Sequence, residues 1–403
     1  MIDVSPKESA VKWFGLAAFT GSLAEATQTI AMVWTAYTLT KSGLLVGSIH
    51  AAAYLPAVLA GLFFHKFADR GNASRLLIKN NWGLFVGSTT LTAGWFAFKS
   101  HYFVIAFIFI AQCTLSIVKL MNKVYLNREI RNSYSPPIAS RILSSYTAAS
   151  MVGSLLGGAS AGLLLTMASP PWCAGLAAVF YFVNHQVIKQ VLTDPARTCS
   201  ELSDDPQDQN VPSSSSTIRS TFVTVLIFSI PSSGALPYFS TLLPSLSEAL
   251  AKNPAGMYSI LSIVSTLGGF LAGLSVARFN NAYYIALRFA LPLSAASIIP
   301  LSLSDNPYLN IPFCLITSFT LTTHIIAMQI SANQMSPQDT VGKMVVFRNT
   351  VAGLSKAIFS LAAGYICDSL GLPKAWIALT CLLSFFTVAW IITPTRFTEH
   401  RLK

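Results

Sequence analysis

Residues 43–64 read GLLVGSIHAAAYLPAVLAGLFF and contain no Asp, Glu, Lys or Arg. A helix of about 20 apolar residues is long enough to cross roughly 30 Å of hydrocarbon, whereas a strand of a membrane barrel needs about half that number. The length and the apolar composition of this stretch therefore predict a transmembrane helix.

Apolar stretches of similar length recur from one end of the 403-residue chain to the other. The chain is 53% hydrophobic and only 10% charged, which leaves too few charged side chains to cover the surface of a soluble protein. We therefore predict an all-α membrane protein with twelve transmembrane helices. The predicted spans are 11–39, 43–64, 76–98, 101–126, 141–167, 171–192, 218–246, 254–276, 280–301, 307–335, 342–370 and 372–393.

The Lys and Arg residues, which give the chain a net charge of +11, fall mostly on one side of the predicted membrane. If the N-terminus is cytoplasmic, the outer loops carry only Lys41, Lys99, Lys252 and Lys374. Because Lys and Arg are retained in cytoplasmic loops, both termini are predicted to be cytoplasmic, and the expected location is a bacterial inner (plasma) membrane. The basic charge then requires no nucleic-acid partner, and we expect a monomer.

A polar segment rich in Ser and Pro separates the first six spans from the last six at residues 193–217. Its composition predicts a flexible cytoplasmic linker. The linker divides the chain into an N-terminal six-helix bundle, residues 1–192, and a C-terminal six-helix bundle, residues 218–403. Duplicated halves of this kind in transporters enclose a substrate site near the middle of the bilayer.

The loop after the second span, HKFADRGNASRLLI at residues 65–78, resembles the loop between helices 2 and 3 of the major facilitator superfamily. Asp69 and Arg70 match the family pattern, whereas residues 72–74 depart from its Gly-Arg-Arg core. Independently of the family, Asp69 can accept hydrogen bonds from a helix N-terminus and pair with Arg70 or Arg75, which predicts a conformational latch. The alternative is that these charges only set the topology.

Two further stretches are similar to the superfamily branch that contains macrolide-efflux and siderophore-exporting members. TLTKSGLLVG at residues 38–47 is similar to the segment that leads into the second helix of that branch, and GSLLGG at residues 153–158 resembles the antiporter motif, with Ser in place of its Pro. The resemblance implies efflux by an antiporter. Gly153, Gly157 and Gly158 also predict close packing of two helices, which explains these residues without any role in antiport.

One carboxylate, Glu25, falls near the middle of the first predicted span. An ionised carboxylate at that depth costs several kcal/mol unless it takes up a proton, meets a partner or faces water. Glu25 is therefore predicted to couple transport to protons, and the branch that the chain resembles has an acidic residue at the matching point. Gln28 shares its helix face and is predicted to bind substrate. A structural hydrogen bond is the alternative for Glu25.

The fourth predicted span carries two ammonium groups, Lys119 and Lys123, four residues apart on one helix face. Gln112 extends this polar face, and Asn122 lies between the two lysines in the sequence. Lys119 lies past the middle of the membrane, so we expect it to face a hydrated cavity. All four side chains are predicted to bind substrate, although Lys123 could instead reach the membrane interface.

The C-terminal half supplies four further candidate residues. His324 is predicted to be a second proton carrier, with packing as the alternative, and Arg348 and Lys356 are predicted to bind substrate. The seventh span contains three prolines and a glycine. These residues predict an interrupted helix that lines a gate, with Tyr238 binding substrate at its outer opening, unless the prolines only kink the helix.

The predicted cavity has an excess of positive charge, because Lys119 and Lys356 outnumber Glu25. We therefore predict a secondary active transporter, a proton-coupled exporter of an anionic small molecule such as a siderophore or metallophore, working by alternating access. Lipid or lysolipid flipping, uptake of an anionic metabolite and multidrug efflux are the alternatives. A rival interpretation of the charges is an internal pair between Glu25 and one of the two lysines.

An enzyme is not expected, because the carboxylates are too dispersed for a catalytic site. The sequence has no Walker loop, so we expect no ATP-driven step. The six cysteines are scattered without a paired motif, so we predict no metal site. No cofactor is expected either. The predicted partners are the substrate, protons and membrane lipid.

Overall fold

The structure, a computed structural model, describes residues 6–64, 72–98, 100–193, 215–278, 282–335 and 341–392. These residues form twelve helices, one for each predicted span. In chain order they are α1 (Pro6–Thr40), α2 (Gly43–Phe64), α3 (Ala73–Ala97), α4 (His101–Ser133), α5 (Pro136–Met167), α6 (Pro170–Thr193), α7 (Ser215–Leu250), α8 (Pro254–Arg278), α9 (Ala282–Leu303), α10 (Pro307–Met335), α11 (Val341–Leu370) and α12 (Leu372–Ile392).

The prediction of an all-α membrane protein is confirmed. Eight of the helices within the described residues are long and apolar enough to cross a membrane. Several helices extend beyond the predicted apolar spans, and α4 continues to Ser133 instead of ending at 126. The extension is polar, and its Glu129 accepts hydrogen bonds from Ser74 at 2.7 Å and Ser133 at 2.8 Å. Hydropathy marks the membrane-crossing part of a helix and misses a turn that continues beyond it.

The helices group into two compact units. Unit 1 comprises Met1–Lys41, Ala52–Pro212 and Ala255–Ile263, and unit 2 comprises Ser42–Ala51, Ser213–Pro254 and Val264–Lys403. The start of α2 thus groups with unit 2, and the start of α8 groups with unit 1.

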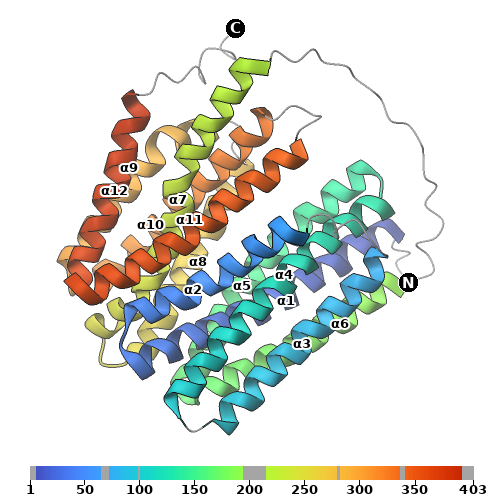
Figure 1. Cartoon of the computed structure of the whole chain (residues 1–403), viewed down its shortest axis with the longest axis horizontal. Helices are drawn as coiled ribbons and strands as arrows, with labels where there is room; N and C mark the ends of the chain where they lie inside the picture. The colour runs from blue at the N-terminus through green and yellow to red at the C-terminus, as the bar shows by residue number, and fades with distance from the viewer. Residues whose placement is uncertain are drawn as a thin grey trace. The chain divides into compact units, whose positions relative to one another are not determined.

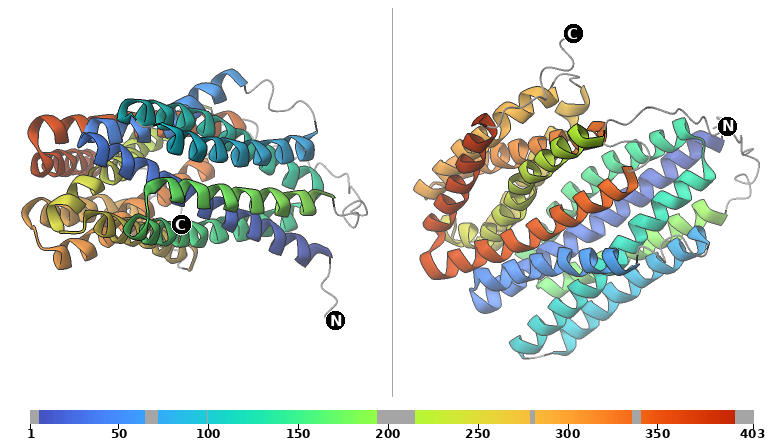
Figure 2. Two further views of the ribbon diagram at one scale, coloured as in Figure 1. Left: turned by 90° about the horizontal axis from the view of Figure 1, so that it is seen from below. Right: turned by 45° about the horizontal axis from the view of Figure 1, so that its top comes forward.

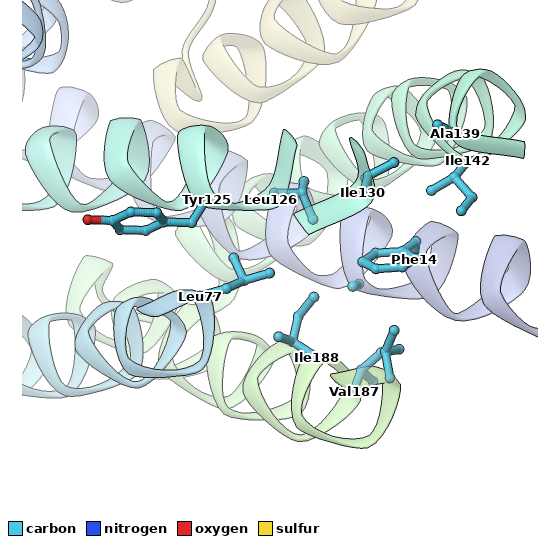
Figure 3. Close-up of a cluster of buried hydrophobic side chains, with 11 residues drawn as sticks. Phe14, Leu77, Tyr125, Leu126, Ile130, Ala139, Ile142, Val187 and Ile188 are labelled. Atoms are coloured by element: carbon cyan, nitrogen blue, oxygen red, sulfur yellow. The ribbon is translucent and has the colours of Figure 1, made fainter. Parts of the chain in front are cut away.

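Unit 1 is organised around α1, which packs against α5 and α6, while α3 packs against α4 and α6 (Figures 1 and 2). A buried cluster holds one end of this bundle together. Figure 3 shows Phe14, Leu77, Ile130 and Ile188 pointing toward one another from α1, α3, α4 and α6. Four helices therefore share one apolar core, as expected of a helical bundle.

The contact between α1 and α5 depends on two glycines. A methyl group at Gly153 would overlap the carbonyl oxygen of Phe19, and one at Gly157 would meet the backbone of Leu23. Thr27 reinforces this contact, because its hydroxyl donates to the Gly157 carbonyl oxygen at 3.1 Å. Small residues let the two backbones approach closely, which is how helices pack where lipid removes the hydrophobic driving force.

Unit 2 is organised around α7, which packs against α10, α11 and α12, while α9 packs against α10 and α12. The predicted interruption of α7 is wrong, because one helix runs from Ser215 to Leu250 with three prolines inside it. Its apolar window is 78% buried, against 44% or less for the other apolar windows of the described residues. Packing on several sides stabilises α7 despite the hydrogen bonds that proline removes.

Replacing Gly153 with Ala should destabilise unit 1 by about 1–3 kcal/mol, because the added methyl group forces the α5 and α1 backbones apart. Gly158→Ala is the matched control, since a methyl group there meets only Ile263 and Ile30 at ordinary distances of 3.5 and 3.6 Å. Thermal unfolding of the purified protein in detergent measures both. Equal melting temperatures for the two variants would contradict close packing at Gly153.

Candidate functional site

Two of the predicted intramembrane charges form an ion pair in unit 1. The ammonium Nζ of Lys119 on α4 lies 3.3 Å from Oε1 of Glu25 on α1. The two side chains differ in exposure, since Lys119 is 18% exposed and Glu25 is 55% exposed. The carboxylate is therefore the accessible member of the pair, and the ammonium group is the shielded one.

Three phenols surround this pair. Tyr54 on α2, Tyr146 on α5 and Tyr181 on α6 are each close enough to interact electrostatically with Glu25. The charges are thus approached from α1, α2, α4, α5 and α6, which places them on the interior side of unit 1. The Tyr181 hydroxyl is buried beside Lys119, close enough to interact with its ammonium group.

The two glutamines that were predicted to bind substrate are both buried. Gln28 on α1 accepts a hydrogen bond from Ser88 on α3 at 3.1 Å, while its Nε2 has no partner within the described ranges. Gln112 on α4 is 2% exposed, and its Oε1 is likewise unpartnered among the residues that the structure describes. Unpaired buried amide atoms are uncommon in proteins. These two atoms, Nε2 of Gln28 and Oε1 of Gln112, can each still form a hydrogen bond.

Asn122 belongs to a hydrogen-bonded cluster of three asparagines that the sequence analysis missed. Asn81 on α3 donates to Asn122 at 2.9 Å and accepts from Asn184 on α6 at 2.8 Å. The amide of Asn122 is therefore already engaged in joining helices. Lys123 is exposed. The signal that could have identified the cluster is the occurrence of Asn in otherwise apolar spans, at Asn80 and Asn81 in span 3 and at Asn184 in span 6.

The candidates of the C-terminal half lie in unit 2. His324 is fully buried, and its Nδ1 lies 2.9 Å from the hydroxyl oxygen of Ser232 on α7. Arg348 donates to the carbonyl oxygen of Gln329 at 3.4 Å, and Lys356 is half-buried. Tyr238 is 4% exposed and donates to the carbonyl oxygen of Ala375 at 2.9 Å. A cavity shared with Glu25 and Lys119 of unit 1 stays a prediction.

The predicted latch is described only in part. Asp69 and Arg70 lie outside the described residues. Arg75 is exposed in the first turn of α3, where its backbone N–H donates to the capping side chain of Asn72 at 3.1 Å. Asn72, which departs from the family pattern, therefore has a clear role as an N-cap.

A polar contact that the sequence analysis missed joins α11 to the start of α2. Asp368, near the end of α11, accepts from the backbone N–H groups of Gly43 at 2.6 Å and Leu44 at 3.0 Å and from the hydroxyl of Ser42 at 2.6 Å. The N–H of Leu45 donates to Ser42 Oγ at 3.2 Å. Together they satisfy the first N–H groups of α2, which otherwise lack partners.

Glycines allow this approach of α2 to α11. A methyl group at Gly47 would overlap the carbonyl oxygen of Ser360, and one at Gly364 would overlap the backbone of Gly43. Residues 42–47 therefore fit a backbone surface of α11 that side chains would block. Their match to the exporter pattern has a packing explanation within unit 2.

Among known protein families, the Major Facilitator Superfamily matches residues 14–360, which is most of the chain. The chain belongs to the major facilitator superfamily. It is a multi-pass membrane transporter of this superfamily, with the twelve helices expected. The match does not reach the level of a branch, so the macrolide-efflux and siderophore-exporting branch stays a prediction. A comparison with curated protein sequences finds no match.

Solved structures of superfamily transporters share the fold. A POT family transporter in complex with 5-aminolevulinic acid has a TM-score of 0.76 at 10% identity, covering 95% of this chain and 96% of that one. The nucleoside transporter NupG has a TM-score of 0.69 at 12% identity, covering 95% and 98%. A peptide transporter POT in complex with sulfate has a TM-score of 0.69 at 14% identity, covering 94% and 93%. At these identities the likeness concerns the fold.

Asp368→Ala should lower the stability of this transporter by about 1 kcal/mol, because the first N–H groups of α2 lose a charged acceptor. Asp305→Ala is the control, since Asp305 is also exposed and lies in the connection between α9 and α10. Hydrogen exchange of residues 42–50 is the sharper measurement, and it should accelerate in Asp368→Ala alone. Unchanged exchange there would show that the cap contributes nothing.

Proposed function

We propose that this chain is a proton-coupled secondary transporter of a small molecule with anionic groups, working by alternating access. We further propose that Glu25 and Lys119 are its coupling pair. The observation that supports this is the ion pair itself, with Nζ and Oε1 3.3 Å apart and the carboxylate more exposed than the ammonium group. A carboxylate that is accessible to protons thus neutralises a shielded positive charge.

The pair links protonation to substrate binding. While Glu25 is ionised, it compensates the charge of Lys119. When Glu25 takes up a proton, Lys119 is left uncompensated in a shielded site, which is strongly unfavourable unless another anion replaces the carboxylate. A substrate carboxylate can do so. By linkage, proton binding at Glu25 and anion binding at Lys119 then favour each other.

Export requires a different use of the same pair. A proton gradient drives efflux when the proton and the substrate compete for the transporter. A zwitterionic metallophore meets this requirement, because its cationic group can pair with Glu25 while its carboxylate pairs with Lys119. A proton on Glu25 then displaces the cationic group. Together with the resemblance to exporters, this favours a siderophore or metallophore exporter that acts as an antiporter.

Uptake of an anionic metabolite is the second candidate, and the ion pair favours it for one class of substrate. A substrate without a cationic group binds best at Lys119 when Glu25 is protonated. Proton and anion then cross the membrane in the same direction. A purely cationic drug would leave Lys119 uncompensated and fits this site poorly.

The substrate can be identified by untargeted mass spectrometry of cells and medium, comparing cells that lack the transporter with cells that carry it or a variant. Under export, an anionic or zwitterionic compound should accumulate inside the deficient cells. Under uptake, it should accumulate in the medium. Lys119→Ala should fail to restore the normal distribution, whereas Lys79→Ala, which removes an exposed lysine of α3, should restore it. A distribution restored by Lys119→Ala would remove Lys119 from the site.

Glu25→Gln should still bind that compound but should lose the dependence of transport on a pH gradient, because the amide cannot release a proton. Purified transporter in liposomes with an imposed pH gradient measures this. Lys119→Ala should weaken binding of the compound at least about tenfold, the loss expected for a hydrogen bond to a charged group. Gradient-driven transport that persists in Glu25→Gln would contradict the coupling role.

A further inference from the structure

The ammonium group of Lys119 has a second polar neighbour besides Glu25, the phenol of Tyr181 on α6. The phenol lies close enough to the ammonium group to interact with it. An ammonium group can only donate hydrogen bonds, so the phenol oxygen is the acceptor in this contact. Lys119 therefore has a carboxylate at 3.3 Å and a neutral acceptor, supplied by two different helices.

Packing fixes the position of the Tyr181 side chain. It is 1% exposed and belongs to a buried cluster with Ala24 of α1 and Leu115 of α4. Ala24 directly precedes Glu25, and Leu115 lies one helical turn from Lys119 on the same face of α4. The tyrosine ring thus packs against the same segments of α1 and α4 that carry the ion pair. A side chain packed in this way has a defined position, whereas a lysine stem is flexible.

The asparagine cluster fixes α4 and α6 one turn away from this contact. Asn122 follows Lys119 by three residues on α4, and Asn184 follows Tyr181 by three residues on α6. Asn81 of α3 is hydrogen-bonded to Asn122 at 2.9 Å and to Asn184 at 2.8 Å. The separation of the two helices beside the ammonium group is therefore set by neutral hydrogen bonds, which do not depend on the charge of the nearby carboxylate.

The position of Lys119 becomes critical when its carboxylate partner is neutralised. In the proposed function, a proton on Glu25 removes the negative partner of the ammonium group. The four-carbon stem of lysine is then free to adopt other rotamers, and ordering it again would weaken the binding of an anion. A phenol keeps its neutral acceptor whether or not Glu25 is protonated. It can hold one N–H of the ammonium group while the other two remain available to an anion.

We propose that Tyr181 is a positioning residue of the transport site, which holds the ammonium group of Lys119 while Glu25 is protonated. Tyr181 acts through Lys119 and does not itself bind the substrate. Its part in transport rests on the proposed function, whereas its contact with Lys119 can be measured without any substrate. The inference adds α6 to the helices that determine how the site binds an anion.

Nuclear magnetic resonance of the purified full-length protein, with ¹⁵N-labelled lysine, tests the contact. A shielded, hydrogen-bonded ammonium group exchanges its protons slowly with water, and Lys119→Arg identifies its signal. Tyr181→Phe keeps the ring but removes the acceptor, so proton exchange at Lys119 should accelerate about tenfold. Tyr125→Phe is the matched control, because Tyr125 is a buried tyrosine of α4 in a separate apolar cluster, and it should leave the exchange unchanged.

Acetate serves as the probe for the role in transport. In Glu25→Gln the side chain is permanently neutral, so acetate should bind at Lys119 and shift its Nζ resonance. Adding Tyr181→Phe to this variant should weaken acetate binding about tenfold, because the ammonium group is no longer held in place. Adding Tyr125→Phe instead should leave acetate binding unchanged.

The positioning role and the proposed function fail on different results. Exchange at Lys119 that is as fast as at the exposed Lys79, or that Tyr181→Phe leaves unchanged, would overturn the positioning role. So would acetate binding that is insensitive to Tyr181→Phe. A resonance that does not respond to acetate in Glu25→Gln, together with faster exchange in Tyr181→Phe, would instead contradict anion binding at Lys119 and thus the proposed function.

A second variant keeps the test decisive if Tyr181→Phe does not fold. Incorporation of a ring-fluorinated tyrosine at position 181 preserves the shape of the side chain and makes its oxygen a weaker acceptor. Exchange at Lys119 should then accelerate, by less than in the absence of the hydroxyl. Unchanged exchange in this protein would overturn the positioning role.

Discussion

The cost of an uncompensated charge in hydrocarbon is the constraint on which the proposed function depends. Lys119 is nearly shielded within unit 1, so it needs an anion beside it at every stage of a transport cycle. In the structure that anion is Glu25, at 3.3 Å. In the proposed function, an event that neutralises Glu25 leaves Lys119 in need of another anion, and this need would couple protons to the substrate.

The apolar surroundings also determine how the helices are held together. Backbone groups are satisfied within each helix, so contacts between helices rely on small residues and on polar side chains that find partners. Gly153 and Gly157 let α5 approach α1. Asn81, Asn122 and Asn184 join α3, α4 and α6. In unit 2, serine and threonine hydroxyls make the equivalent contacts between α9 and α10 at 2.7 and 2.8 Å.

Asp368 caps the N-terminus of a helix that is distant in the sequence. Its carboxylate accepts from the start of α2, more than 300 residues away, and satisfies N–H groups that α2 cannot satisfy itself. The segment Ser42–Ala51 therefore groups with unit 2, although the rest of α2 groups with unit 1.

The sequence by itself determined the fold class and the place of each helix, because a helix that crosses a bilayer must satisfy its own backbone and be apolar over about 20 residues. It also marked Glu25 and Lys119, since charges are rare at that depth. Only the tertiary structure decided that these two residues are partners, that α7 continues through three prolines, and that Asp368 caps α2. Each of these depends on which helices become neighbours. Local composition does not show which helices pack against one another, because a glycine, an asparagine or an exposed aspartate reads the same in the sequence whatever it contacts.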